Sequence, residues 1–356
     1  MSALARALNE PAVAAERPRV LIVDDSSVAR AVIERIIGET ARFEVAAALP
    51  DAATALDWLS RERVDVILLD IEMPGVDGLT ALPDLIASAR GARILVVSSS
   101  AQDGASTSVQ ALALGAADTL VKPVAGSLAG QFTQALVDRL ARLTGDGEAV
   151  EARGERGTVT NAQPFGMIDL LAIGASTGGI HALGQLLRAL PGSFDAPILI
   201  TQHLPGTFIP YFAAQVAVLA GRPCDVAADS MRVRAGRVII APGDAHIRVV
   251  RTSDGAAIRL DRARAASGCM PSVDPMFESV AQIFGDRACG VVLSGMGRDG
   301  LDGARILSNA GGAVVAQDKA TSVVWGMPGA VAQAGIARAI LPPDVIGRLL
   351  ATGRSL

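Results

Sequence analysis

The second half of the chain contains a serine in a setting that suits nucleophilic catalysis. Ser176 lies in Gly174-Ala-Ser-Thr-Gly-Gly179, directly after an apolar run, with small residues on both sides. This G-x-S-x-G pattern predicts a sharp strand-to-helix turn that exposes the hydroxyl above a sheet, where the helix N-terminus favours developing negative charge. Such a serine supports acyl transfer, provided that a base lies beside it.

Two other interpretations of the turn compete with this one. A glycine-rich strand-to-helix turn can cradle a nucleotide pyrophosphate, and this turn resembles the cofactor turn of short-chain dehydrogenases. Those enzymes need a Tyr-x-x-x-Lys pair, but the only tyrosine is Tyr211 and the residue four positions later is Gln215. The dehydrogenase interpretation therefore fails. The other alternative is that Ser176 only caps the following helix.

The candidate base is one of three histidines. His203 directly follows Pro197-Ile-Leu-Ile-Thr-Gln202, the end of the next expected strand. It should therefore emerge at the same sheet edge as Ser176, because parallel strands collect their carboxyl ends at one edge. His181 lies early in the helix expected after Ser176 and is interpreted as a surface or packing residue. His246 lies in a loop that could rim a pocket. Topology therefore favours His203.

Asp299 is the candidate acid that orients this base. It follows the apolar run 290–293 and a Gly-Met-Gly turn, which places it at a carboxyl edge as well. The competing interpretation is that it caps a helix from Leu301. The chain order would be serine, histidine, acid, whereas α/β-hydrolases run serine, acid, histidine. This order predicts another fold with the same arrangement of groups.

A second group of reactive residues lies in the first half of the chain. Asp24 and Asp25 follow the first apolar run, Asp70 and Ser98 follow later ones, and Lys122 precedes a proline. Carboxylates gathered at one sheet edge repel one another and require a hard cation, for which Mg²⁺ is suited. A carboxylate beside Mg²⁺ and a lysine can attack a phosphoryl group. Capping by single aspartates is the alternative, but capping does not require the whole set.

Short strands that alternate with helices must position both groups. Unbroken apolar runs are followed by polar or glycine residues and then by helical patterns, as at 105–114 and 180–190. This alternation predicts parallel sheets covered on both faces. The expected strands are 19–23, 64–69, 93–97, 168–173, 196–200, 237–240 and 290–293.

A polar stretch divides the chain into two α/β domains. Residues 141–165 lack apolar periodicity and are rich in Gly, Glu, Arg, Thr and Asn, which is typical of a linker. Residues 1–17 are interpreted as an N-terminal tail, 18–140 as the first domain and 166–356 as the second.

Composition narrows the function classes. The 356 residues are 50% hydrophobic and 19% charged, as in globular proteins. A net charge of −4 argues against a nucleic-acid partner. No apolar run approaches the roughly 20 residues that span a bilayer, and no signal peptide is recognised. The three cysteines lack metal-like spacing, so free thiols and a cytoplasmic location are expected.

Residues 19 to about 125 resemble a response-regulator receiver domain. The motifs that carry the resemblance are Val23-Asp-Asp-Ser26, Leu69-Asp-Ile-Glu-Met-Pro-Gly-Val-Asp-Gly78 and Val121-Lys-Pro123. The resemblance implies that Asp70 is the phosphoacceptor. The resemblance also implies that Asp24, Asp25, Asp70 and the Glu72 carbonyl bind Mg²⁺. Ser98 and Lys122 would bind the phosphoryl oxygens. Receivers usually carry an aromatic residue three positions before the lysine, where this chain has Thr119.

Residues 167–350 resemble the catalytic domain of chemotaxis protein-glutamate methylesterases, a family in which a linker joins that domain to a receiver. The motifs are Ile173-Gly-Ala-Ser-Thr-Gly-Gly179, Gln202-His-Leu-Pro205, Ala241-Pro-Gly-Asp-Ala-His246, Pro271-Ser-Val-Asp274, Leu293-Ser-Gly-Met-Gly-Arg-Asp-Gly300 and Gly326-Met-Pro-Gly329. The resemblance implies Ser176 as nucleophile, His203 as base and Asp299 as its orienter. It implies oxyanion-binding N–H groups near Thr177 and Met296. The chain departs from the family at Cys269-Met270, where a His-Arg or similar pair is common.

The resemblance implies a fold class and an activity. The fold is α/β, with a flavodoxin-like receiver and a doubly wound parallel-sheet methylesterase domain. The activity is phosphorylation-regulated hydrolysis of glutamate methyl esters on chemotaxis receptors, with deamidation of receptor glutamines. The implied partners are a chemotaxis histidine kinase and the cytoplasmic helices of the receptors, without insertion into the membrane, and the implied cofactor is Mg²⁺ in the receiver.

Three alternatives compete with this activity. One is a hydrolase of the same fold that acts on a non-chemotaxis partner. Another is an interaction domain that has lost catalysis, which the presence of all three catalytic residue types disfavours. The third is a DNA-binding regulator, which an acidic, strand-rich second half disfavours.

Overall fold

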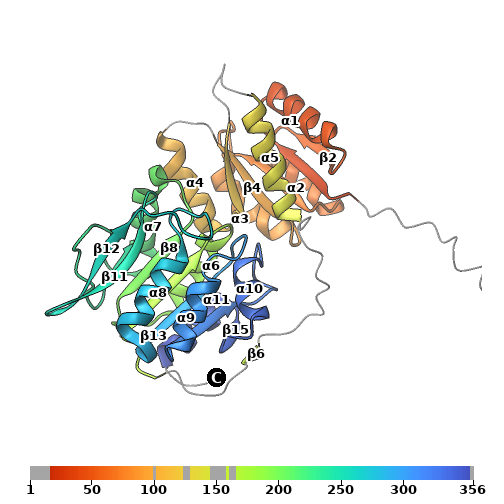
Figure 1. Ribbon diagram of the computed structural model, residues 1–356. Helices are drawn as coiled ribbons and strands as arrows, with labels where there is room; N and C mark the ends of the chain where they lie inside the picture. Colours follow the sequence, from red (N-terminus) through yellow and green to blue (C-terminus); the bar gives the residue numbers. More distant parts are fainter. Residues whose placement is uncertain (1–16, 99–101, 123–128, 145–157, 160–165, 353–356) are drawn as a thin grey trace, which may run out of the picture.

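Two parallel sheets form the frame of the molecule (Figure 1). The structure is a computed structural model that describes residues 17–98, 102–122, 129–144, 158–159 and 166–352. The expected N-terminal tail lies outside these residues except at position 17. Within the described part of the chain, no helix combines the length and apolar character needed to cross a membrane.

The first domain has a five-stranded parallel sheet in the order β2-β1-β3-β4-β5. This is the flavodoxin-like order, so the expected fold class is confirmed. Helices α1 and α5 pack on one face and α2, α3 and α4 on the other. The elements are β1 (Arg19–Val23), α1 (Ser27–Thr40), β2 (Glu44–Leu49), α2 (Ala52–Arg61), β3 (Val66–Asp70), α3 (Gly78–Ser88), β4 (Arg93–Ser98), α4 (Gln102–Leu114), β5 (Asp118–Val121) and α5 (Ala129–Thr144).

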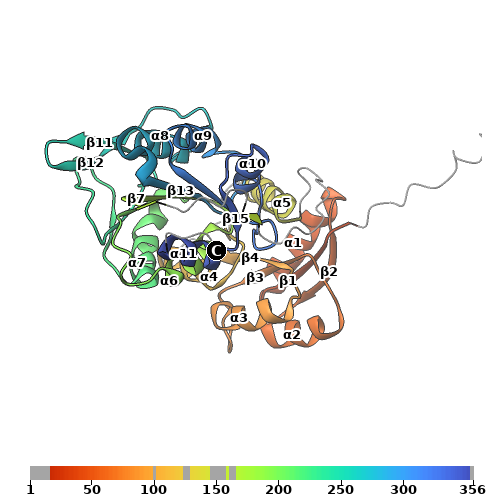
Figure 2. The same cartoon turned by 90° about the horizontal axis from the view of Figure 1, so that it is seen from below.

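The second domain has an eight-stranded sheet in the order β6-β15-β14-β13-β7-β8-β10-β9, parallel except at β6. Figure 2 shows α8 and α9 on one side of this sheet and α6, α7 and α11 on the other. The strands are β6 (Thr158–Val159), β7 (Leu170–Ala175), β8 (Ile198–Gln202), β9 (Cys224–Val226), β10 (Val238–Ile240), β11 (His246–Thr252), β12 (Gly255–Asp261), β13 (Ala288–Val292), β14 (Ala313–Gln317) and β15 (Ala339–Leu341). The helices are α6 (Gly179–Ala189), α7 (Ile209–Ala220), α8 (Val273–Phe284), α9 (Leu301–Asn309), α10 (Met327–Gln333) and α11 (Pro343–Thr352), with short 3₁₀ turns at Gly206–Phe208 and Gly285–Arg287.

Burial explains the unbroken apolar runs of the sequence. Every residue of β3, β7 and β13 is buried, because helices cover both faces of each sheet. The side chains that cap the helices of the first domain are Ser26, Asp51 and Asp77, which accept from the N–H groups at the starts of α1, α2 and α3. Neither Asp25 nor Asp70 is an N-cap of these helices, so the capping alternative does not account for the acidic cluster.

The structure differs from the expected domain boundaries at the linker. Helix α5 continues to Thr144, four residues into the expected linker 141–165, because Leu140 and Leu143 are buried against the first sheet. Strand β6 also falls within that range and pairs with β15. The antiparallel hairpin of β11 and β12, which packs on α8, was not predicted, since it stands outside the alternation of parallel strands and helices.

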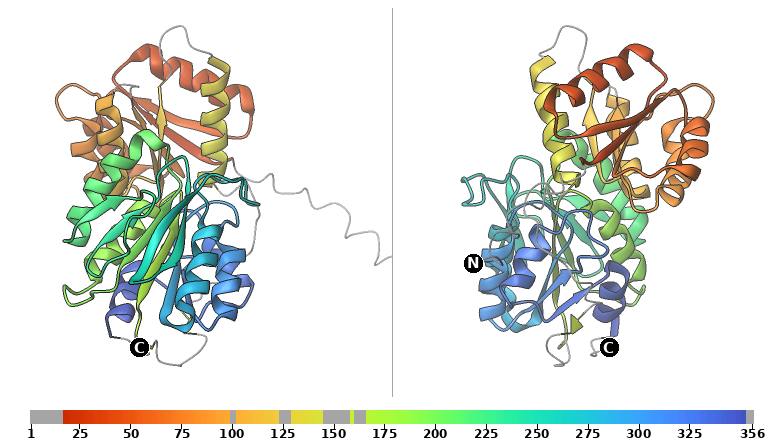
Figure 3. Two further views of the ribbon diagram at one scale, coloured as in Figure 1. Left: turned by 60° about the vertical axis from the view of Figure 1, so that its left-hand side comes forward. Right: turned by 90° about the vertical axis from the view of Figure 1, so that its right-hand side faces the viewer.

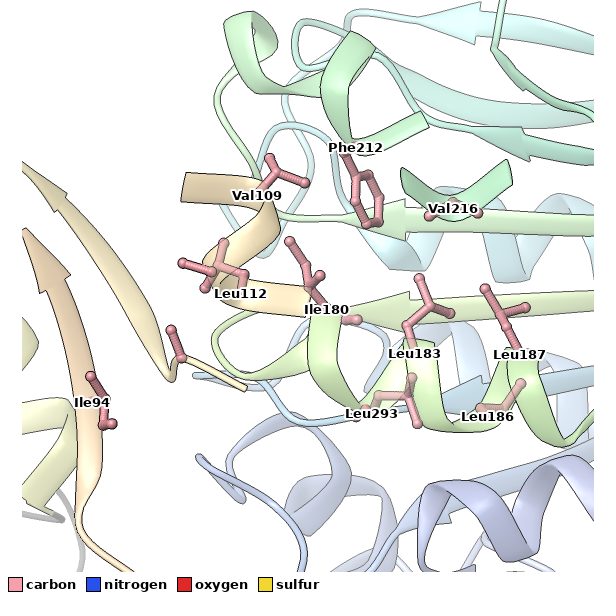
Figure 4. Packing of buried hydrophobic residues seen from close by; sticks show 14 of the residues in the cluster. Ile94, Val109, Leu112, Ile180, Leu183, Leu186, Leu187, Phe212, Val216 and Leu293 are labelled. Atoms are coloured by element: carbon pink, nitrogen blue, oxygen red, sulfur yellow. The ribbon is translucent and has the colours of Figure 1, made fainter. Parts of the chain in front are cut away.

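The two domains meet along α4 of the receiver-like half (Figure 3). Figure 4 shows Val109 and Leu112 of α4 beside Ile180 of α6 and Phe212 of α7. All four side chains are buried and belong to one hydrophobic cluster that runs through both domains. The position of α4 therefore depends on the second domain as well as on its own sheet.

Candidate active site and phosphorylation site

Ser176 directly follows β7 and lies in the predicted strand-to-helix turn. Gly178, the N-cap of α6, has a φ of 75°, which suits glycine because it lacks a Cβ. A Cβ at Gly178 would lie 2.4 Å from that of Val323. No side chain caps α6, so the capping alternative for Ser176 is wrong and its hydroxyl is left for other contacts.

Neighbouring side chains fix the backbone around this serine. The Ser176 N–H donates to the carbonyl of Ser294 at 3.0 Å, and the Ser294 hydroxyl donates to the Thr177 carbonyl at 2.8 Å. Nε2 of Gln202 donates to the Ser176 carbonyl at 2.9 Å. The motifs quoted from the sequence contain Ser294 and Gln202, but their roles depend on contacts between distant segments and were missed.

Ser176 lies at the point in the sheet where the order of the strands reverses direction. Strands β8 and β13 flank β7 on opposite sides, and such a switch point leaves a crevice at the carboxyl edge. The loop after β13 reaches the serine: a Cβ on Gly295 would lie 2.8 Å from the Cβ of Ser176. Glycine at 295 therefore permits the approach of the segment that carries Asp299.

His203 and Asp299 lie in direct contact at this edge. Nε2 of His203 is 2.8 Å from Oδ2 of Asp299, which leaves Nδ1 as the ring nitrogen not bound to the acid. The Asp299 side chain is 1% exposed and that of His203 is 18% exposed. Helix α9 has no side-chain cap, so the capping alternative for Asp299 is also wrong. No hydrogen bond joins the Ser176 hydroxyl to His203 among the described residues, as is common in enzymes without substrate.

Asp299 receives further hydrogen bonds from the start of α8. The Ser272 hydroxyl donates to Oδ1 at 2.5 Å and the Val273 N–H donates to Oδ2 at 2.8 Å. Burial raises the pKa of Asp299, but the hydrogen bonds from His203, Ser272 and Val273 outweigh it and hold the pKa well below its usual range. Asp299 is therefore a carboxylate that can accept a hydrogen bond from the ring N–H of His203. Sequence reasoning assigned no role to Ser272.

Asp274 is a second carboxyl close to Asp299. Burial raises the pKa of Asp274 to about 7, and the negative charge of Asp299 adds to the effect of burial. The Gly303 N–H, which donates to Asp274 Oδ1 at 2.8 Å, acts in the opposite direction. Asp274 thus ties α8 to α9 beside the acid that holds His203.

The other two histidines do not contact Asp299. His246 is 1% exposed and does not rim a pocket. Its Nδ1 accepts from the Ser272 N–H and its Nε2 donates to the Ala263 carbonyl, both at 2.8 Å. It therefore joins the two ends of the loop before α8. His181 lies beside Ala113 of α4 and Gln185 of α6, which agrees with its interpretation as a packing residue.

The two predicted oxyanion donors lie in loops beside the serine. Within the described part of the chain, the N–H groups of Thr177 and Met296 donate to no protein acceptor. Met296 is 48% exposed and lines a cleft of about 1030 Å³ between the two domains. The cleft walls carry more cations than carboxylates: Arg93, Arg142, Arg298, Arg305 and Lys319 against Asp138.

In the first domain, the structure brings the predicted acidic cluster together. Carboxylate oxygens of Asp24, Asp25 and Asp70 lie within 4.8 Å of one another. Nζ of Lys122 lies 2.9 Å from Asp24 Oδ2 and 2.7 Å from Asp70 Oδ2. Burial raises the pKa of Asp70, while Lys122 lowers it. One ammonium group cannot balance three carboxylates, so the site has the charge and the oxygen ligands that suit Mg²⁺.

Ser98 lies near this cluster but has its own partner. Its hydroxyl is 3.1 Å from the hydroxyl of Ser108 on α4, and both residues are buried. The N–H of Glu72 is 3.3 Å from Asp70 Oδ1, which places its backbone beside the predicted phosphoacceptor. Thr119, at the usual aromatic position, lies in β5 and is half-buried.

The first domain also contacts the turn that carries Ser176. The N–H of Gly178 donates to the carbonyl of Ala117 at 3.0 Å, and Ala117 directly precedes β5. Val323, from the second domain, packs against the core of the first. The first domain therefore covers part of the crevice in which Ser176 and His203 lie.

The fold and the two sites define a response regulator whose second domain carries serine, histidine and aspartate at one edge of a parallel sheet. The chain belongs to the CheB methylesterase family. Residues 171–350 match the family model described as CheB methylesterase, and residues 20–129 match that of the response regulator receiver domain.

Similar proteins cover nearly the whole chain. The sequence is 41% identical over 341 residues to protein-glutamate methylesterase/protein-glutamine glutaminase 2 of Caulobacter vibrioides, across 94% of this chain and 98% of that protein. It is 40% identical over 362 residues to the protein of Azospirillum brasilense named protein-glutamate methylesterase/protein-glutamine glutaminase, across 92% and 91%. The crystal structure of the Thermotoga maritima CheB methylesterase catalytic domain matches with a TM-score of 0.50 at 35% identity, across 52% of this chain and 97% of that one.

Proposed function

We propose that this protein hydrolyses methyl esters of glutamate side chains on chemotaxis receptors, under the control of phosphorylation at Asp70. The observation that carries the proposal is the His203–Asp299 hydrogen bond beside the turn that presents Ser176. The names of relatives that span more than 90% of the chain support the substrate. The same names favour receptor glutamates over a partner outside chemotaxis as the substrate.

The chemistry follows from these three side chains. Oγ of Ser176 attacks the ester carbonyl carbon while Nδ1 of His203 takes the hydroxyl proton. The bond to the methoxy group then breaks, and the leaving oxygen takes that proton and departs as methanol. Water activated by His203 hydrolyses the acyl-enzyme and restores the serine and the glutamate. The N–H groups of Thr177 and Met296 stabilise the oxyanion.

The same route accepts a glutamine side chain. An amide carbonyl passes through an equivalent tetrahedral intermediate, and ammonia leaves in place of methanol. The relatives' names include this glutaminase activity. The cations that line the interdomain cleft suit a glutamate-rich receptor helix, because the cleft carries more positive than negative groups. The partners proposed are therefore the cytoplasmic helices of the receptors, and the location proposed is the cytoplasm.

Asp70 is the proposed phosphoacceptor, with a chemotaxis histidine kinase as donor. Asp24, Asp25, Asp70 and the Glu72 carbonyl would hold Mg²⁺, which when bound offsets the negative charge that develops during phosphoryl transfer. Lys122 already lies against Asp70 and would bind a phosphoryl oxygen. The contact between Ala117 and Gly178 supports a model in which the unphosphorylated receiver covers the catalytic crevice.

The Ser98–Ser108 hydrogen bond could transmit phosphorylation of Asp70 to the contact between the two domains. This route needs no aromatic residue at position 119. When the Ser98 hydroxyl turns to the phosphoryl group, the buried Ser108 hydroxyl on α4 loses its partner. An unpaired buried hydroxyl costs about 1–3 kcal/mol. That cost disfavours the docked position of α4, which packs on α6 and α7 through Val109 and Leu112.

Substitution Ser108→Ala should weaken the response to phosphorylation. Without a hydroxyl at 108, no buried group loses a partner when Ser98 turns away. We expect the stimulation by a small phosphodonor to fall by about fivefold or more, equivalent to about 1 kcal/mol of coupling. Ser106→Ala, on the same helix, is the matched control. Phosphorylation of Asp70, measured separately, should remain intact. Full stimulation of the Ser108→Ala variant would contradict this path.

The proposed function as a whole is tested by methanol release from methylated receptor membranes. We expect release by the wild-type protein, and faster release when a small phosphodonor and Mg²⁺ are present. The absence of release under both conditions would refute the assignment of receptor glutamate methyl esters as the substrate.

A further inference from the structure

Cys269, at one of the two positions where the chain departs from its family, lies beside the proposed catalytic pair. Its Sγ, a ring nitrogen of His203 and a carboxylate oxygen of Asp299 all lie within 4.8 Å of one another. Sequence spacing gave no sign of this cluster, because its members come from three segments that only the fold brings together. None of the proposed steps of ester hydrolysis uses the thiol.

The loop that carries Cys269 is fixed against the same residues. The Cys269 N–H donates to the Ser267 hydroxyl at 3.3 Å, and that hydroxyl donates to Ser272 at 3.1 Å. Ser272 in turn donates to Asp299. The two ends of the loop are joined through His246. The thiol is therefore held beside His203 and Asp299 by a chain of hydrogen bonds.

The three donors match the ligands of a zinc-type ion. Thiolate, imidazole and carboxylate bind Zn²⁺ at about 2.0–2.3 Å, so ligand atoms around one ion lie about 3.3–3.7 Å apart. The limit of 4.8 Å exceeds this spacing by about 1 Å, so the thiol needs to move by no more than about that distance, while His203 Nε2 and Asp299 Oδ2, now 2.8 Å apart, need to separate slightly. Cys269 and His203 are both half-buried, which leaves a fourth position open to water. A soft sulfur ligand also favours Zn²⁺ over Mg²⁺.

We propose that His203, Cys269 and Asp299 form a binding site for Zn²⁺ or a similar soft divalent cation, and that its occupancy inhibits hydrolysis. On binding, the thiol releases its proton and the imidazole binds as the neutral ring. A histidine bound to a metal cannot accept the proton of Ser176. This inhibition goes beyond the proposed function and applies to any ester that Ser176 attacks. The binding itself stands whether or not the proposed substrate is correct.

Binding is tested first without an activity assay. The full-length protein is titrated with Co²⁺ alone, and the near-ultraviolet absorption band of a cobalt–thiolate bond is recorded. We expect the band in the wild-type protein and in Cys224→Ser, a matched change of another half-buried cysteine. We expect no band in Cys269→Ser. Ions held by the receiver aspartates have oxygen ligands and do not produce this band.

Inhibition is tested next with Zn²⁺ alone, in the absence of phosphodonor. Each rate is divided by the rate of the same variant in chelator. The Zn²⁺ concentration for half-inhibition should rise by at least about 10- to 100-fold in Cys269→Ser, because the loss of a direct ligand costs no less affinity than the loss of a group that only orients a ligand. It should stay unchanged in Cys224→Ser. Equal inhibition of Cys269→Ser and wild type, or a Co²⁺ spectrum without a thiolate band in the wild type, would overturn the site. A thiolate band without methanol release would keep the site and refute only the proposed substrate.

Discussion

Substitution Ser176→Ala should reduce methanol release by about 10⁴- to 10⁶-fold, because the nucleophile of a covalent mechanism cannot be replaced by another group in the site. The turn itself should survive. Its hydrogen bonds to Ser294 and Gln202 involve the Ser176 main chain rather than its hydroxyl. The measurement is the initial rate of methanol release, with the thermal unfolding midpoint recorded for each variant.

A matched control separates loss of the nucleophile from loss of a serine in general. Ser308→Ala changes a half-buried serine on α9 of the same domain and should keep the wild-type rate. If the Ser176→Ala variant is folded and still releases methanol at a tenth of the wild-type rate or faster, the nucleophile lies elsewhere.

Substitution Asp299→Asn should lower kcat by about 10⁴-fold with little change in KM, the effect expected when the acid that orients a catalytic histidine becomes an amide. Asp299 accepts three hydrogen bonds, from His203, Ser272 and Val273. An amide offers one acceptor oxygen, and its NH₂ group faces donors. The ring of His203 then loses the acceptor that keeps its proton on Nε2 and its Nδ1 free.

Asp302→Asn is the control for this second prediction. Asp302 is exposed in the first turn of α9, so the substitution removes one negative charge near the site without touching His203. It should change kcat by less than about threefold, as expected for an exposed charge. The double variant Ser176→Ala/Asp299→Asn should be no slower than Ser176→Ala, because groups that act as one unit are not additive. A kcat within tenfold of wild type for Asp299→Asn would contradict the role of the acid.

The residues at strand ends could be predicted from the sequence because parallel strands impose their arrangement. Ser176 and His203 each follow a buried strand directly, and neighbouring strands of a parallel sheet end at one edge. The same argument predicted the cluster of Asp24, Asp25 and Asp70. The catalytic roles themselves remain proposals, which the two substitutions above test.

The supporting contacts could not be predicted, since each joins segments far apart in the chain. Ser272 reaches Asp299 across 27 positions, and Ser294 reaches Thr177 across 117. A lone serine in a loop has no periodicity that indicates its partner. The hydrogen bond between Ser98 and Ser108 is close in sequence, but it depends on how α4 lies against β4. The hairpin of β11 and β12 is local, and it was missed for a different reason: it stands outside the alternation of parallel strands and helices.

The two departures from the family pattern have different structural settings. Thr119 lies in β5, two residues after Ala117, whose carbonyl accepts from the serine turn. Cys269 lies against the proposed catalytic pair, where its thiol adds a metal ligand. A departure from a family motif can therefore add a property to a site and leave the chemistry of the remaining residues unchanged.

The most direct test of the central claim is methanol release from methylated receptor membranes by the wild-type protein and by Asp70→Asn, each with and without a small phosphodonor and Mg²⁺. We predict release by both proteins, with acceleration by the phosphodonor only in the wild type. Acceleration of Asp70→Asn to the same extent, or no release by the wild type under either condition, would contradict a serine esterase controlled by phosphorylation of its receiver.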